Sequence, residues 1–177
     1  MLSLAPLGAE FMVNNSTALT QHDSAIAMDS DGDFVVAFSS FYGAYGVDYM
    51  DGVFLRRYKA DGTAQGTEFL VNTFTTGNQN EVAVAMSPGG SFVVVWTSEG
   101  QDDNGSPTGK GIFARRFDVA GAPQGSEFQV NTYTTGDQYD PSIAMDASGN
   151  FVISWTSTQQ DGDGTGVFAR RFDSAGG

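Results

Sequence analysis

The sequence predicts an all-β fold: a β-propeller built of four-stranded antiparallel blades, with three repeats in the chain. A motif, Gly-x-Glu-Phe-x-Val-Asn, recurs about every 58 residues, around Glu10, Glu68 and Glu127. Each complete copy holds four short apolar segments separated by Gly-rich turns. No window shows helical apolar periodicity beyond a single turn. Repeats of this length with four strands are typical of propellers, and a β-solenoid or a string of small sandwiches is the alternative.

The third copy illustrates how each strand is predicted. Pro141–Met145 is a run of small and apolar residues, which suits the crowded position next to a propeller axis. The Asp146–Asn150 segment forms a turn, because Asp caps turns and a Gly within it adopts positive φ. Phe151–Ser157 is the second strand, rich in β-branched and aromatic residues, and Val167–Asp173 is the third. In complete copies a fourth strand, such as Ser126–Asn131, follows a Gly-rich turn.

The chain is a single repeat array. Its three copies span about residues 8–65, 66–124 and 125–177. The 177 residues are 40% hydrophobic and include 14 Phe, which is enough to bury a core. An aromatic residue near the end of the second strand recurs in every copy, and we expect these residues to anchor the core: Phe38, Trp96 and Trp155.

Acidic residues dominate the charge. The chain has 21 Asp and Glu but 8 Lys and Arg, a formal net charge of −13. Such a surface repels nucleic acid and anionic membranes, so we expect no nucleic-acid partner. No apolar run approaches the ~18 residues of a membrane helix, so no membrane insertion is expected. Cysteine is absent, which excludes disulfides and thiol chemistry, and the first residues lack the pattern of a signal peptide.

The two ends of the chain resemble two parts of one blade. The segment 5–11 aligns with an outer strand, and the segment 171–176 aligns with the end of a third strand and its turn. We therefore expect a homo-oligomer joined by exchanged outer strands, which also covers an aggregation-prone edge. Two chains would complete a six-bladed ring, within the roughly 4–8 blades of known rings. A head-to-tail filament and an excerpt of a longer array are the alternatives. The expected interface residues are Glu10, Phe11, Val13, Phe168, Arg170 and Phe172.

Acidic loops are the candidates for metal binding. The segment 29–33, Asp-Ser-Asp-Gly-Asp, partly matches calcium-loop spacing. A hairpin turn is the simpler explanation, because the equivalent segments 87–91 and 146–150 lack these three carboxylates. A second acidic group follows the second strand in later copies, where solvated turns are again the alternative. No pattern requires a cofactor. Ca²⁺ is the candidate ion, with the candidate ligands Asp29, Asp31, Asp33, Asp102, Asp161 and Asp163.

The paired arginines of the third strand are assigned to structure rather than to nucleic-acid binding. Adjacent residues of a strand face opposite sides, so one arginine of each pair joins the Phe face. We expect the other to meet the recurring glutamates, or a nearby Asp, across the sheet. The pairs are Arg56-Arg57, Arg115-Arg116 and Arg170-Arg171.

No residue is predicted to be catalytic. No Ser/His/Asp set recurs, and the one histidine, His22, is replaced by Asn80 and Tyr139 in the other copies. The rival hypothesis is a carbohydrate-binding or carbohydrate-cleaving propeller, and cleavage would need two carboxyls about 5–10 Å apart. Its candidate acids are Asp48, Asp51, Glu99 and Asp102. An aromatic group in the first copy is the candidate for a ligand site or for a contact between chains: Phe41, Tyr42, Tyr45 and Tyr49.

The repeat resembles tandem repeats of large secreted bacterial proteins, many of which carry haemolysin-type calcium-binding segments. The resemblance lies in Gly-Val-Phe-Ala-Arg-Arg-Phe-Asp, Gly-x-Glu-Phe-x-Val-Asn-Thr and Phe-Val-Ile-Ser-Trp-Thr-Ser, and it covers nearly the whole chain. It implies an extracellular or cell-surface protein with a structural or adhesive role. The calcium-binding nonapeptide Gly-Gly-x-Gly-x-Asp is not present in this chain. A non-enzymatic structural or adhesive module is thus the leading hypothesis, and an amplified or engineered repeat without a ligand is a further alternative.

Overall fold

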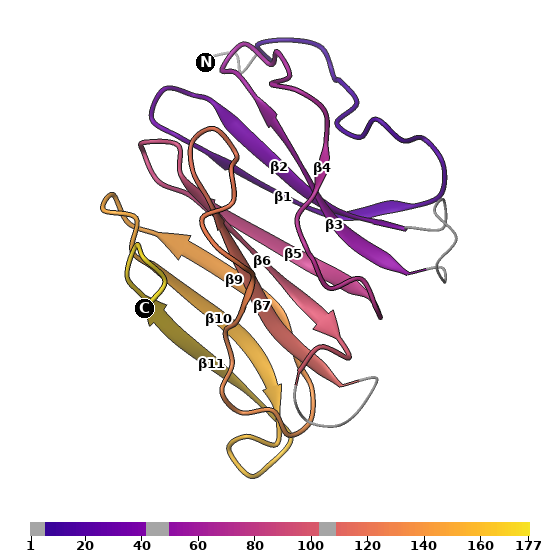
Figure 1. Ribbon diagram of the computed structural model, residues 1–177, viewed down its shortest axis with the longest axis vertical. Coiled ribbons are helices and arrows are strands. Elements are labelled where there is room, and N and C mark those ends of the chain that lie inside the picture. The colour runs from indigo at the N-terminus through magenta and orange to yellow at the C-terminus, as the bar shows by residue number, and fades with distance from the viewer. Residues whose placement is uncertain (1–5, 42–49, 103–108) are drawn as a thin grey trace, which may run out of the picture.

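The computed structural model describes residues 6–41, 50–102 and 109–177, which form eleven strands and no helix. Three antiparallel sheets, or blades, follow one another along the chain (Figure 1). Blade 1 contains β1 (Gln21–Met28), β2 (Phe34–Phe41), β3 (Asp51–Tyr58) and β4 (Phe69–Leu70). Blade 2 contains β5 (Gln79–Met86), β6 (Phe92–Glu99), β7 (Lys110–Phe117) and β8 (Phe128–Gln129). Blade 3 contains β9 (Gln138–Met145), β10 (Phe151–Thr158) and β11 (Thr165–Phe172).

The strand order confirms the predicted fold class. Each blade is a meander in which chain neighbours pair, β1-β2-β3-β4 and β5-β6-β7-β8, while blade 3 has three strands, β9-β10-β11. The first strands of the blades contact one another, β1 with β5 and β5 with β9. These are the strands with small residues, which occupy the inner position as predicted.

The hairpin turns repeat one design. In the turn after β9, the Asp146 carboxylate accepts the backbone N–H groups of Ser148 and Asn150, at 2.8 and 2.9 Å. Gly149 has a φ of 81°, and its N–H donates to the Asp146 carbonyl. A side-chain hydrogen bond from Asn150, reinforced by the backbone donors, lowers the pKa of Asp146 below its ordinary value. The same turn joins β1 to β2 at Asp29.

The outer strands are shorter than the sequence predicts. Ser126–Asn131 was expected to be a strand, but β8 covers two residues of it. The reason is that an asparagine side chain takes the place of a backbone carbonyl in the strand pairing: the Ile112 N–H donates to Asn131 Oδ1 at 2.8 Å. Asn131 Nδ2 in turn donates to Gln138 Oε1 at 2.9 Å, which ties the exit from blade 2 to the first residue of β9. Asn72 and Gln79 do the same between blades 1 and 2.

The inner strands begin earlier than predicted, because each contains a bulge. β9 starts at Gln138 rather than at Pro141. One acidic residue in each inner strand has a positive φ, between 51° and 54° (Asp23, Glu81 and Asp140). The pairing register of each inner strand shifts at or next to this residue. A bulge of this kind bends the strand and redirects its side chains.

The hydrophobic core lies between the blades. One cluster joins blades 1 and 2 and includes Leu55, Val84 and Trp96. A second cluster joins blades 2 and 3 and includes Ile112 and Trp155. The two tryptophans are therefore core anchors, as the sequence predicts. In the part of the chain that is described, no helix is long and apolar enough to cross a bilayer.

Candidate functional site

Polar groups that recur in every copy converge on the junctions between blades. The first arginine of each pair reaches back to the preceding outer segment. Arg115 Nη1 donates to the Val71 carbonyl at 2.8 Å, and its guanidinium lies 5.7 Å from the centre of the Phe117 ring. Arg56 donates in the same way to Val13, and Arg170 to Val130.

In blades 1 and 2 the second arginine of the pair reaches forward to a turn of the next blade. Arg57 donates to the carbonyl groups of Val119 and Ala120. Arg116 Nη1 donates to the Ser174 carbonyl at 2.8 Å. The expected pairing of arginine with glutamate is therefore wrong: within the described ranges no arginine forms a salt bridge. Peptide carbonyls, which are fixed by the turns, take the guanidinium donors instead.

The recurring glutamates bind peptide N–H groups. Glu127 accepts the N–H groups of Thr73 and Phe74, at 2.6 and 3.1 Å, and the side-chain amide of Gln101 at 2.7 Å. Glu68 accepts the N–H of Asn15 at 2.7 Å. Glu68 and Glu127 thus each connect their own outer segment to the equivalent segment one repeat earlier.

The bulge acids form a second set of connections, on the inner strands. The Glu81 N–H donates to Asp23 Oδ2 at 3.2 Å, and the Asp140 N–H donates to Glu81 Oε2 at 2.9 Å. Thr97 also donates to Glu81 Oε2, at 2.6 Å. These connections are not predicted from the sequence. An acid at the same position of all three copies was the available signal, but only the bulge brings each carboxylate to the next blade.

His22 lies beside the first bulge acid and joins two carboxylates. Its Nδ1 is 3.0 Å from Asp23 Oδ2 and its Nε2 is 3.1 Å from Asp51 Oδ1. Burial lowers the pKa of His22, but hydrogen bonds and charges from the two aspartates outweigh that effect and raise the pKa above 6.5. Asp51, one of the acids of the rival hypothesis, is therefore engaged by the histidine.

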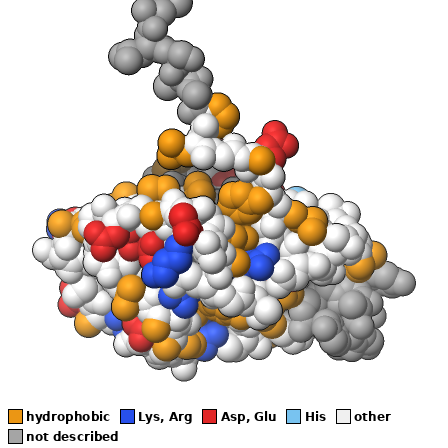
Figure 2. Space-filling model, turned by 90° about the horizontal axis from the view of Figure 1, so that it is seen from above, with side chains coloured by type: hydrophobic (Ala, Val, Ile, Leu, Met, Phe, Trp, Pro, Cys, Tyr) orange, Lys and Arg blue, Asp and Glu red, His pale blue; other side chains and the backbone are white. Residues whose placement is uncertain are grey.

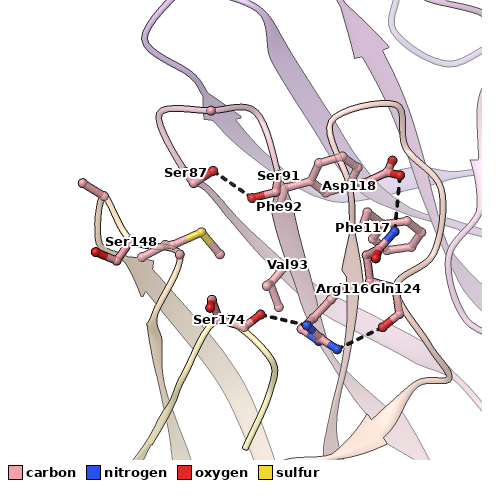
Figure 3. Close-up of a pocket in the computed structure, with 14 residues that line it drawn as sticks. Ser87, Ser91, Phe92, Val93, Arg116, Phe117, Asp118, Gln124, Ser148 and Ser174 are labelled. Atoms are coloured by element: carbon pink, nitrogen blue, oxygen red, sulfur yellow. Dashed lines mark hydrogen bonds between the residues drawn. The ribbon is translucent and has the colours of Figure 1, made fainter.

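A cavity of about 340 Å³ opens between blades 2 and 3, at their hairpin turns (Figure 3). Ser87 and Ser91 line it with their hydroxyls 2.8 Å apart, and the Arg116 guanidinium lies between the carbonyl groups of Ser174 and Gln124. The equivalent space between blades 1 and 2 is about 20 Å³ and is lined by Val119. Ser174 occupies the position of Val119 in the next copy, so a smaller side chain leaves the second space open.

The acidic turn 29–33 has the hydrogen bonds of the other hairpin turns. Asp29 Oδ1 accepts the N–H groups of Asp31 and Asp33, each at 2.9 Å. Asp33 pairs with Lys59 at 2.9 Å and accepts the Ala60 N–H at 3.0 Å. Across the described ranges, no three His, Asp or Glu side chains are placed to hold one metal ion.

The second acidic group lies on the loops that follow the second strands. Asp102 is buried and packs against Gly111, while Asp161 contacts Gly166 at the equivalent position. Asp163 is exposed, and its N–H lies 3.4 Å from Asp161 Oδ1. A glycine is required near the start of the third strand in blades 2 and 3 because the aspartate side chain lies close to the position that a Cβ would take.

Of the four aromatic ligand candidates, Phe41 lies in the described part of the chain. Phe41 ends β2, is half-buried, and donates its N–H to the Thr20 carbonyl at 3.0 Å. Tyr42, Tyr45, Tyr49 and the acid Asp48 lie outside the described residues. Glu99, another acid of the rival hypothesis, accepts the side-chain amide of Asn78 at 2.7 Å.

The expected interface residues fall into two groups at opposite ends of the array. Phe11 packs on Tyr58, with ring centres 5.3 Å apart, and the Val13 carbonyl accepts from Arg56. Glu10 belongs to the same segment and is exposed. Phe168, Arg170 and Phe172 lie on β11, where Phe172 stacks on Phe151.

Comparisons place the fold but no family. No protein-family model matches the sequence, and no curated protein matches it. A solved endo-arabinase from Bacteroides thetaiotaomicron aligns with 93% of this chain at 14% identity and a TM-score of 0.55. A Hadza microbial sialidase aligns with 88% at 12% identity and a TM-score of 0.64. A protein of unknown function from Dyadobacter fermentans aligns with 93% at 13% identity and a TM-score of 0.61.

The chain spans 60%, 36% and 54% of these three proteins respectively. At such low identity the likeness concerns the fold alone. The three sheets are β-propeller blades, distantly similar in structure to those of glycoside hydrolases.

Proposed function

We propose that the chain is a non-enzymatic structural or adhesive β-propeller module of an extracellular or cell-surface bacterial protein. One observation carries the proposal: recurring acids and arginines that have a neighbouring blade within the chain bind the backbone of that blade or of its outer segment. Glu127, Glu81 and Arg115 each bind the backbone of a neighbouring blade or its outer segment. Residues that serve the same contact in successive copies are parts of a scaffold.

The cavity between blades 2 and 3 supports the same conclusion. Glycoside hydrolysis commonly uses two carboxyls about 5–10 Å apart. Among the described residues that line this cavity, Asp118 is the one carboxylate. It caps its own turn by accepting the N–H groups of Ala120 and Ala122. That arrangement favours a structural role over acid–base chemistry.

Hydrolysis assays test the absence of enzymatic activity. The purified chain is incubated with arabinan and with a chromogenic sialoside. These substrates are chosen because two of the structurally similar proteins are named endo-arabinase and sialidase. We expect no release of sugar above that of a heat-denatured control. Release by the native chain that is lost in Glu81→Gln would overturn the proposal.

Carbohydrate binding is the second candidate function. The likeness in fold to glycoside hydrolases and the polar lining of the cavity favour it. Ser87 and Ser91 offer hydroxyls, and Arg116 offers guanidinium donors, for a hydroxyl-rich ligand. A glycan array would test it. Binding that Ser174→Val abolishes would locate the ligand in this cavity.

Calcium is proposed as an optional ligand of the acidic turn 29–33, not as a required cofactor. The partial spacing match and the three carboxylates in that turn support it. Calorimetric titration with CaCl₂ of the native chain and of Asp31→Asn gives the test. Equal heats from the two proteins would remove this turn as the site.

A further inference from the structure

We propose that the outer edge of blade 3 binds the segment Pro6–Asn14 of a second copy of this chain, so that chains join head to tail. The inference rests on the structural role proposed above and names its partner. We call Pro6–Asn14 the donor segment and the free side of β11 the acceptor edge. The two junctions inside the chain provide the template for a third junction between copies.

Inside the chain, a third strand makes three bonds to the segment that follows it. In blade 2 the Val130 N–H donates to the Ile112 carbonyl at 2.8 Å. The Ile112 N–H donates to Asn131 Oδ1 at 2.8 Å. The Gln124 N–H donates to the Arg116 carbonyl at 2.8 Å. Blade 1 repeats all three bonds with Val71, Val53, Asn72, Gln65 and Arg57.

The acceptor edge presents the same groups without such a segment. Val167 occupies the position of Ile112, and within the described residues no strand pairs with the outer side of β11. The Val167 side chain is 80% exposed, whereas Ile112 and Val53 are 0% exposed. Val152 on the same face of blade 3 is 38% exposed, against 3% for Val93. Blade 3 therefore has an apolar face and a polar edge of the kind that other blades cover.

The donor segment already makes the contacts with blade 1 that the outer segments of blades 1 and 2 make with the next blade. Phe11 packs on Tyr58 of blade 1, as Phe69 packs on Phe117 of blade 2 and Phe128 on Phe172 of blade 3. Arg56 Nη1 holds the Val13 carbonyl at 2.8 Å. The segment needs no rearrangement to receive a blade, so little conformational entropy is lost on binding.

The face of blade 1 beside the donor segment is also uncovered. Ile26 is 62% exposed, whereas Val84 at the same position of blade 2 is 8% exposed in the junction with blade 1. Met28 is likewise exposed. Figure 2 looks onto the blade 1 end and shows hydrophobic side chains at this surface. Exposed apolar groups at positions that are otherwise buried mark a contact surface.

The repeat fixes the register between copies. Phe54 lies opposite Leu70, and Phe113 lies opposite Gln129. Phe168 of one copy accordingly lies opposite Met12 of the other. In this register the Val13 N–H donates to the Val167 carbonyl and the Val167 N–H donates to Asn14 Oδ1.

The carboxylate connections extend across the same contact. Glu10 of the second copy accepts the Thr132 N–H of the first copy, as Glu127 accepts that of Thr73. Asp140 takes the Asp23 N–H of the second copy, as Glu81 takes the Asp140 N–H within one chain. Every junction then has one connection near the axis and one at the outer edge. Two chains give six blades, a number at which propellers close.

Solution mass by light scattering tests the contact. The native chain, of 18.7 kDa, is expected as a dimer or a longer head-to-tail species. Val167→Lys places a charge on the acceptor edge and should return the mass to that of a monomer, with circular dichroism unchanged. Ser126→Lys is the control, because Ser126 is exposed on the outer segment of blade 2; its mass should equal that of the native chain.

Disulfide cross-linking tests the register between copies. The native chain has no cysteine, so only the introduced cysteines can form a disulfide. The variant Met12→Cys/Phe168→Cys should form a disulfide between chains under mild oxidation, seen on a non-reducing gel. Phe54→Cys/Leu70→Cys is the control and should cross-link within one chain. Each single variant should not cross-link.

A native chain that stays monomeric at its highest soluble concentration, or a folded Met12→Cys/Phe168→Cys variant that does not cross-link while the control does, would overturn the inference. Both outcomes leave the proposed structural function standing. Sugar release in the hydrolysis assay would overturn that function without affecting the contact between chains, so the two failures are distinguishable.

Discussion

Blades 2 and 3 have nearly the same sequence along their third strands, Gly-Ile-Phe-Ala-Arg-Arg-Phe and Gly-Val-Phe-Ala-Arg-Arg-Phe, but they differ in surroundings. β7 is buried between β6 and β8, whereas β11 has exposed residues along most of its length. The comparison shows that position in the array, not local sequence, decides which of these residues are core. It also predicts that equivalent substitutions have unequal effects.

The largest difference is expected for truncation of the branched residue at the start of the third strand. Ile112→Ala should lower the free energy of unfolding by about 2–5 kcal/mol, because it leaves a cavity in a packed core. Val167→Ala should change the free energy of unfolding of the monomer by less than about 0.5 kcal/mol. Urea denaturation followed by tryptophan fluorescence measures both. Equal losses would mean that blade 3 is covered within one chain.

A smaller effect is expected for the recurring glutamates. Glu127→Ala removes an acceptor from two peptide N–H groups and from Gln101, and should cost about 1–3 kcal/mol of unfolding free energy. Glu10→Ala should leave the unfolding free energy of the monomer unchanged but weaken association between chains. Dilution series in light scattering separate the two variants. A stability loss in Glu10→Ala as large as that of Glu127→Ala would contradict the assignment.

The cavity gives a third comparison, between the two junctions. Ser174→Val should fill part of the space between blades 2 and 3 and raise the unfolding free energy by less than about 1 kcal/mol. Val119→Ser should lower it by a similar amount, since it opens the smaller space between blades 1 and 2. Thermal denaturation of both variants is the measurement. Changes of the same sign would show that filling this space does not govern stability.

The smallest effect is the pH dependence of His22, which only blade 1 contains. Its pKa is raised in the folded chain, so its stabilising contribution is present below about 6.5 and is lost as pH rises through the folded pKa. His22→Gln should therefore lose more stability at pH 5.5 than at pH 8.5, by less than about 1 kcal/mol. Tyr139→Gln, at the same position of blade 3, is the control and should show no such difference. A loss that grows with pH would have the wrong sign.

Several features of the site could be predicted from the sequence. The acidic turn at Asp29 and the glycine at each turn followed from turn chemistry, and the tryptophans followed from their place in apolar strands. The role of Glu127 did not follow, because its partners Thr73 and Phe74 lie in the preceding copy. The predicted partners of the arginines were wrong. Every residue has a backbone carbonyl, so the sequence does not indicate which carbonyl accepts from an arginine.

The sequence by itself determined the strands, their order within a blade and the number of repeats, because these depend on apolar alternation and turn residues that act over short distances. The tertiary structure alone decided which equivalent residues are buried and where the bulge acids point. Those properties depend on the neighbour across each junction. Val167 and Ile112 differ by one methylene, yet Val167 is 80% exposed and Ile112 is 0% exposed. The reason is that Val167 faces solvent whereas Ile112 faces a neighbouring blade.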